Sequence, residues 1–164
     1  MALAADTVNG PAFGCSTPRV SCWRVDPAGV PAEWVESTVA TEGQLTLVYF
    51  VKGGYGVEAL QRNRPSARDI AVVTGARVLT VACSQRGKPS DIAAVNRGLN
   101  AYAWLLSEGC DVDQTAFTHD ANGAALAESI LVVARNQGLP VPAGGIWPCR
   151  PRSRSLGRGV QRGA

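Results

Sequence analysis

The sequence is poor in aromatic side chains, in charge and in histidine. Aromatic residues make up 6% of its 164 residues and charged residues 18%, whereas 46% are hydrophobic. This balance is typical of a globular domain and excludes a disordered chain. The only histidine is His119, and none of the five cysteines has CxxC spacing. Such a set does not provide the usual ligands of a zinc site, so we expect no metal and no cofactor.

Long apolar runs are also missing. No run approaches the roughly 18 residues that a membrane-spanning helix requires. Residues 1–14 lack the basic and apolar regions of a signal peptide. An odd number of scattered cysteines indicates free thiols in a reducing compartment rather than a disulfide framework. We therefore expect a cytoplasmic protein with no membrane span.

Acidic side chains are absent from residues 150–164, which carry five of the 16 basic residues. The other 11 basic residues face 13 acidic ones, so the rest of the chain has a net charge of −2. The basicity thus belongs to the tail, and no nucleic-acid partner is expected for the body. The composition divides the chain into an irregular arm at 1–18, an α/β domain at 19–148 and a basic, disordered tail at 149–164.

Strand patterns alternate with helical ones, which predicts an α/β fold with a mostly parallel sheet and flanking helices. The apolar runs at 45–51 and 77–82 are typical of strands buried on both faces. Other strands are expected at 19–26 and 32–36, as a hairpin, at 115–118 and from 141 to 147. Helices are expected at 65–74, with Pro65 in the first turn, at 91–106 and at 124–137.

Two loops that follow strands contain glycine in patterns that suit ligand binding. Gly53 and Gly54 follow the strand at 45–51, and their N–H groups can form an oxyanion hole, a phosphate nest or only a tight turn. The loop at 82–90 imitates a phosphate-binding loop through Gly87 and Lys88. Pro89 stands where that motif needs Ser or Thr, so a polar connection is the favoured interpretation.

A third loop, at 118–123, joins a strand to a helix by a sharp turn, the geometry of a nucleophile elbow. An elbow needs Ser or Cys at its apex, whereas the apex here is Ala121. His119 is interpreted as a turn residue near the edge of the sheet. An improvised general base at His119 is the alternative.

Taken in order, these segments resemble the hormone-sensitive-lipase family of α/β-hydrolases. The family motif HGGGY corresponds to residues 51–55, TGARVL to 74–79 and GDSAGG to 119–124, while a DYRLAPE-like loop is replaced at 82–88. The resemblance covers residues 19–147. It implies the N-terminal half of an α/β-hydrolase fold and a carboxylesterase or lipase that acts on small acyl esters.

The same resemblance implies the roles of individual residues. The nucleophilic Ser maps onto Ala121, and the oxyanion hole maps onto Gly53, Gly54 and Asn122. The family's acid and His belong to later strands, which we expect this chain to lack. The sequence therefore predicts a hydrolase scaffold with weak or no activity. A non-catalytic binding or interaction remnant and, less favoured, a nucleotide-binding α/β domain are the alternatives.

The chain's last residues add two expectations. A sheet that ends early exposes a strand edge, so we expect self-association. The abrupt change of composition at residue 149 has a shifted reading frame as one explanation, and a basic tail that meets phosphates or acidic membranes as another; an unstructured tail without a function is the favoured interpretation.

Overall fold

The computed structural model describes residues 19–38, 45–51, 53–54, 56–84, 91–120 and 123–145. The predicted arm at 1–18 and tail at 149–164 lie outside these residues. So do the Gly87–Lys88 pair and two of the predicted site residues, Ala121 and Asn122.

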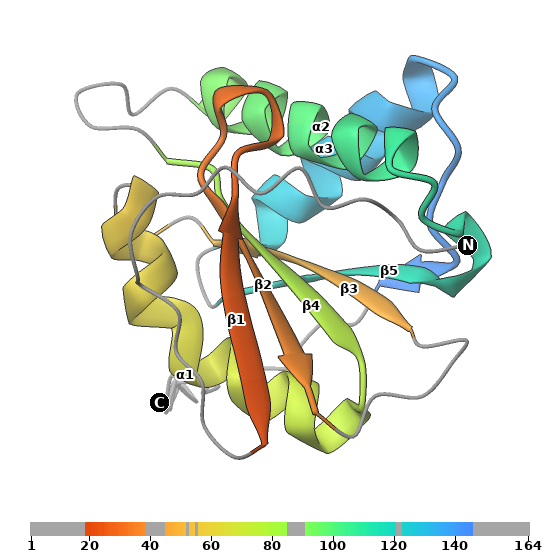
Figure 1. The fold of residues 1–164 in the computed structure, drawn as a ribbon. Coiled ribbons are helices and arrows are strands. Elements are labelled where there is room, and N and C mark those ends of the chain that lie inside the picture. The colour runs from red at the N-terminus through yellow and green to blue at the C-terminus, as the bar shows by residue number, and fades with distance from the viewer. Residues whose placement is uncertain are drawn as a thin grey trace, which may run out of the picture.

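The described part of the chain forms one sheet of six strands with three helices (Figure 1). The strand order is β1-β2-β4-β3-β5-β6, with β1 and β2 antiparallel to their neighbours and the other pairs parallel. The predicted α/β fold with a mostly parallel sheet and flanking helices is confirmed. The strands are β1 (Val20–Val25), β2 (Ala32–Ser37), β3 (Thr46–Val51), β4 (Arg77–Ala82), β5 (Thr115–His119) and β6 (Gly144–Gly145). The helices are α1 (Gly56–Thr74), α2 (Asp91–Ser107) and α3 (Ala124–Asn136), and short 3-10 turns precede β2 (Pro27–Gly29) and β5 (Val112–Gln114).

The two faces of the sheet carry separate cores because side chains alternate along each strand. Helix α1 covers one face, against Leu47 and Tyr49 of β3. Helices α2 and α3 cover the other face, against Val48 and Phe50 (Figure 1). Every residue of β3 is buried. This explains why its sequence is a continuous apolar run rather than an alternating one.

Helix α1 begins nine residues earlier than the predicted start at Pro65, which lies inside the helix. Proline in a helix interior removes one backbone hydrogen bond, which costs about 3 kcal/mol. Contacts of the residues before it offset that cost. Leu60 is buried against the sheet, and Asn63 and Arg64 bond to side chains of β3 and β2.

The strand predicted from 141 to 147 begins later in the structure. Among the described residues 141–145, it is Gly144 and Gly145 that pair with β5, opposite Ala116 and Phe117. Residues 146 and 147 lie outside the described part of the chain. Strand β5, in contrast, extends one residue further than predicted, so that His119 belongs to the strand.

Candidate active site

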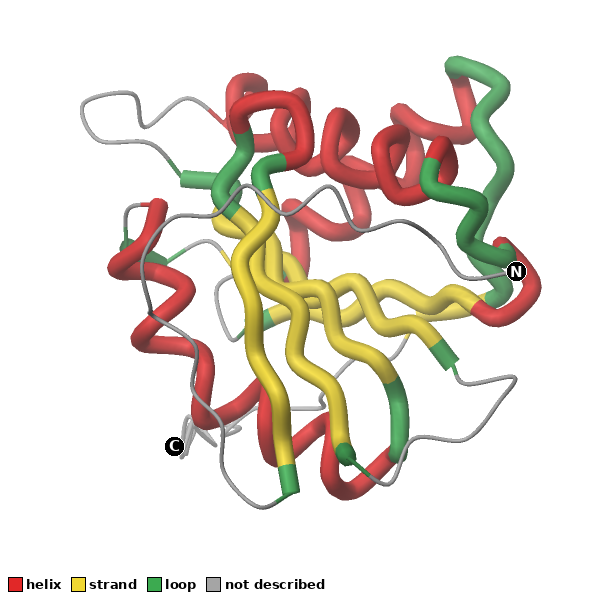
Figure 2. Tube along the Cα trace, in the orientation of Figure 1, coloured by secondary structure: helices red, strands yellow, loops and turns green. Residues whose placement is uncertain are grey.

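The carboxyl ends of β3, β4 and β5 meet at one edge of the sheet. Val51 is opposite Ala82, and Phe50 is opposite His119. The three loops singled out in the sequence therefore leave the sheet side by side, which is where open α/β sheets place their ligand sites. Figure 2 shows α1 and α3 each beginning a short distance beyond the strand before it.

The glycine loop after β3 takes a conformation that depends on glycine. Gly54 has a φ of +96°, a region that L side chains rarely adopt. A Cβ there would also lie 3.4 Å from the Cα and Cβ of Ala59 in the first turn of α1. Gly53 and Gly54 are half-buried at this edge. Backbone N–H groups in such a loop, next to a helix N-terminus, can stabilise developing negative charge.

The turn after β5 closes tightly around a single carbonyl oxygen, that of Phe50. The Asp120 N–H donates to this oxygen at 3.2 Å, and the Gly123 N–H donates to the Asp120 carbonyl at 3.0 Å. A Cβ at Gly123 would lie 2.8 Å from the same Phe50 oxygen and 2.8 Å from Asp120 Oδ1. Gly123 thus allows α3 to start close to the end of β5.

His119 points to the face of the sheet that α2 and α3 cover, as its partner Phe50 does. The side chain is 6% exposed, and its Nδ1 lies 2.6 Å from the carbonyl oxygen of Asp120. That contact fixes the ring against its own backbone. Proton transfer at a bound substrate would therefore have to use the other nitrogen, Nε2.

The loop after β4 starts with a buried thiol. Cys83 is 0% exposed, and burial, with a smaller contribution from the charge of Asp120, raises the pKa of its thiol to about 12, although the Arg97 charge opposes this shift. A thiol with so high a pKa is not a nucleophile near neutral pH. The Cys83 N–H donates to Val51, and its carbonyl accepts a hydrogen bond of 2.6 Å from Arg97 Nε on α2.

Tyr49 forms part of a polar row that crosses the α1 face of the sheet. In register, Glu33 lies opposite Thr80, Thr80 opposite Tyr49, and Tyr49 opposite Thr118. Burial and the charge of Asp120 raise the pKa of the Tyr49 phenol, and a hydrogen bond with Ser66 lowers it less. The row ends at Thr118, two residues before Asp120 in the turn that follows β5.

The structure thus brings together Gly53, Gly54 and His119 of the predicted site residues. Ala121 and Asn122 lie outside the described residues, between two that are described. Sequence reasoning missed Arg97 and Tyr49. Arg97 is the one charged residue after Asp91 in α2, and a lone cation in an apolar helix was a signal. Tyr49 carries the only hydroxyl between Leu47 and Val51, inside an otherwise apolar run.

The described residues contain no group of three or more His, Cys, Asp or Glu side chains placed to hold a metal ion. Among the same residues, no helix has the length and apolar character needed to cross a membrane.

Comparison with known proteins identifies the family. A curated acetyl-hydrolase from Streptomyces hygroscopicus is 31% identical over 115 residues, 70% of this chain and 38% of that protein. A crystal structure of an esterase from the bacterial hormone-sensitive lipase family superposes with a TM-score of 0.71 at 31% identity, over 80% of this chain and 44% of its own. This chain belongs to the hormone-sensitive-lipase family of α/β-hydrolases. No protein-family profile matches it.

A second solved structure is similar over the same part of the chain. The crystal structure of EstE5 soaked with p-nitrophenyl butyrate has a TM-score of 0.71 and 28% identity, over 81% of this chain and 45% of its own. The chain therefore spans less than half the length of the family members it matches, and what it shares with them is the esterase-like scaffold built by these six strands.

Proposed function

We propose that this chain is a carboxylic-ester-hydrolase scaffold whose acyl-enzyme chemistry is impaired. The observation that carries the proposal is the residue that the sequence has at the nucleophile position of the family motif. The family motif GDSAGG has its nucleophilic Ser where this sequence has Ala121. A methyl group cannot attack an ester carbonyl, and it has no proton to transfer.

An ester is proposed as the ligand because the chain keeps the backbone N–H groups that stabilise an oxyanion, although it lacks the nucleophile. Gly53 and Gly54 lie beside the turn after β5, and with the N–H of Asn122 they are proposed to form the oxyanion hole. An oxyanion hole without a nucleophile leaves a small rate over water at most. A short acyl ester is the substrate class proposed, because the related acetyl-hydrolase and esterases carry those names.

Restoring the nucleophile is not expected to restore turnover. The sequence contains one histidine, His119, which precedes the nucleophile position, whereas the family's catalytic His and acid belong to later strands. The Nδ1 of His119 lies against the carbonyl of Asp120. A Ser at position 121 would lack the oriented base that makes Ser reactive.

Hydrolysis of p-nitrophenyl butyrate by the purified chain and by Ala121→Ser tests the proposal, with EstE5 as positive control. We expect no turnover above background in either form of the chain. Turnover by the unmodified chain that is lost in His119→Ala, but kept in the control Ser129→Ala on the exposed side of α3, would overturn it. Mass spectrometry of Ala121→Ser after incubation with the ester shows whether the introduced Ser is acylated once without turnover or does not react.

A non-catalytic binding module is the second candidate, and the same Ala121 favours it. The fold can present an ester to the oxyanion N–H groups without cleaving it. An increase in unfolding temperature with a non-hydrolysable ketone analogue of butyrate esters would support this candidate, since only ligands that prefer the folded state stabilise it. No increase at millimolar analogue would count against it.

We also propose that the chain works in the cytoplasm. Cys83 and Cys110 are free thiols, and free thiols persist in reducing compartments. Recovery of the protein from producing cells in a membrane-free cytoplasmic fraction would support this, and recovery from the medium would contradict it.

A further inference from the structure

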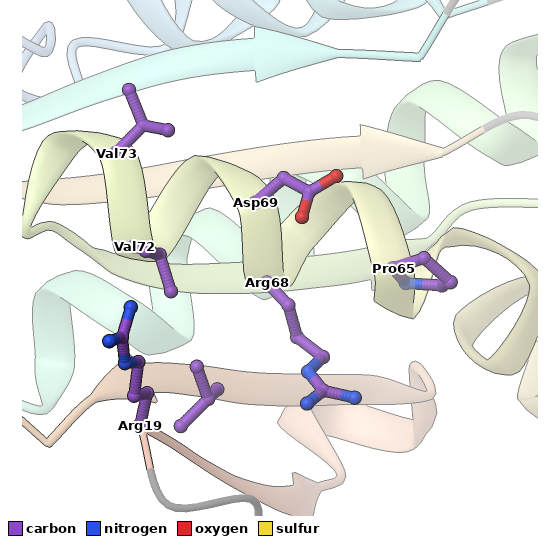
Figure 3. Close-up of a pocket in the computed structure, with 7 residues that line it drawn as sticks. Arg19, Pro65, Arg68, Asp69, Val72 and Val73 are labelled. Atoms are coloured by element: carbon purple, nitrogen blue, oxygen red, sulfur yellow. The ribbon is translucent and has the colours of Figure 1, made fainter.

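A groove between α1 and the start of β1 lies on the α1 side of the molecule, along the helix and away from its N-terminal glycine loop. It has a volume of about 710 Å³. Its apolar lining comes from Val20, Pro65 and Val72, and its charged lining includes Arg19 and Arg68 (Figure 3). The volume falls in the range of small-molecule sites, about 300–1,000 Å³.

The two arginines extend into the gap from opposite walls. Figure 3 shows the Arg19 side chain rising from the start of β1 toward α1, and the Arg68 side chain descending from α1 toward β1. The carboxylate of Asp69, which also contributes to the lining, points away from β1. The space between helix and strand is therefore bordered by two positive charges.

The surface between the arginines is apolar and partly exposed to solvent. Val20 is 2% exposed and belongs to the core, whereas Val72 on the helix is 45% exposed. A ligand that covers Val72 removes apolar surface from water, which favours binding in proportion to the area covered. Two cations beside such a surface fit a ligand with an anionic head and an apolar chain.

We propose that this groove binds a free medium-chain fatty-acid carboxylate. The carboxylate lies between Arg19 and Arg68, whose planar guanidinium groups match its two oxygens. The alkyl chain lies along Val20, Pro65 and Val72. A free phosphate would leave Val72 in water, and a groove between two elements admits one chain rather than a bilayer. The proposal concerns equilibrium binding and stands apart from any hydrolase activity.

Calorimetric titration of the full chain with decanoate at about pH 8, where the carboxylate is ionised, tests the proposal. We expect saturable binding of decanoate that is stronger than that of decanol, and stronger than that of hexanoate by roughly two- to fourfold per buried methylene. Amide shifts in NMR spectra should change first at Val20 and Val72. Equal affinity for decanol, shifts elsewhere, or binding only when anionic lipid vesicles replace decanoate would overturn it.

Variants test the groove itself. Replacing both arginines, Arg19→Gln with Arg68→Gln, should weaken decanoate binding about tenfold. The matched control is Arg62→Gln, an exposed arginine of α1 outside the groove, which should bind as the unmodified chain does. Val72→Ser should weaken the binding of decanoate more than that of hexanoate. Unchanged binding by the double variant, with an unchanged unfolding midpoint, would also overturn the proposal.

Discussion

Arg64 of α1 donates hydrogen bonds to both carboxylate oxygens of Glu33 of β2, at 2.8 and 2.5 Å. Glu33 is 1% exposed and Arg64 is 17% exposed, so the pair lies almost entirely between the helix and the sheet. A bidentate contact of this kind fixes both the position and the rotation of α1. Since α1 starts at the glycine loop, the ion pair also holds that loop at the end of β3.

Arg64→Met is expected to destabilise the fold strongly, because it leaves the Glu33 carboxylate buried without its cation. Breaking one partner of a buried pair costs about 3–5 kcal/mol. The free energy of unfolding in urea measures this loss, and Arg62→Met on the exposed side of α1 is the control, with a change within about 0.5 kcal/mol. The double variant Glu33→Leu with Arg64→Met should recover much of the loss. A single variant as mild as the control would contradict the argument.

Gly123→Ala is expected to disturb the turn between β5 and α3. Its Cβ would lie 2.8 Å from the backbone oxygen of Phe50, which cannot move without moving β3. Overpacking of this kind costs about 1–3 kcal/mol. Gly144→Ala is the matched control, because a Cβ there meets nothing within 4 Å. Equal unfolding free energies for the two variants would mean that the turn relaxes at little cost.

The sequence was sufficient to predict the sheet because its strongest patterns reflect burial. The apolar runs that form β3 and β4 are buried on both faces. A run this short is too short for a typical buried helix, so its length favours a strand. The hairpin of β1 and β2 could be predicted for a different reason. Pro27 starts the 3-10 turn between two alternating strands.

The start of α1 could not be predicted, because local sequence and tertiary contacts disagree there. Pro65 favours a helix start, whereas the long-range bonds of Asn63 and Arg64 favour helix before it. Contacts between residues distant in sequence leave no local pattern. The same limit applies to the candidate site: motif spacing predicted roles for Gly53, Gly54 and His119, but it did not indicate that Arg97 of α2 donates a hydrogen bond to the Cys83 carbonyl at the end of β4.

Self-association through the edge of the sheet remains a prediction that can be tested directly. Gly144 and Gly145 of β6 are exposed, and within the described residues they pair only with β5. An exposed edge offers backbone groups to another chain, and a Lys there discourages pairing. Sedimentation velocity should show concentration-dependent association that Gly145→Lys reduces and Gln137→Lys, at an exposed site after α3, does not. A monodisperse monomer at high concentration would contradict the prediction.

Cys83 is expected to resist alkylation in the folded chain and to make the fold less stable in alkali. Burial raises the pKa of its thiol from 9.0 to about 12, so the folded chain keeps a proton that the unfolded chain releases above pH 9. The stabilising contribution is therefore complete below pH 9 and is lost as pH rises toward 12. Tyr102, with a pKa raised from 10.0 to about 12 mainly by burial, acts in the same direction.

Two measurements separate the contribution of Cys83 from that of Tyr102. Iodoacetamide near neutral pH should modify the half-buried Cys110 well before Cys83, which should react once urea unfolds the chain. The unfolding free energy of the unmodified chain should fall more steeply between pH 9 and pH 11 than that of Cys83→Ala, because the variant lacks the Cys83 thiol, whose proton the unmodified chain releases on unfolding. Parallel pH profiles would assign the alkaline loss to tyrosine. Early modification of Cys83 would show that the edge of the sheet opens at β4, which would make this thiol accessible to ligands at the candidate site.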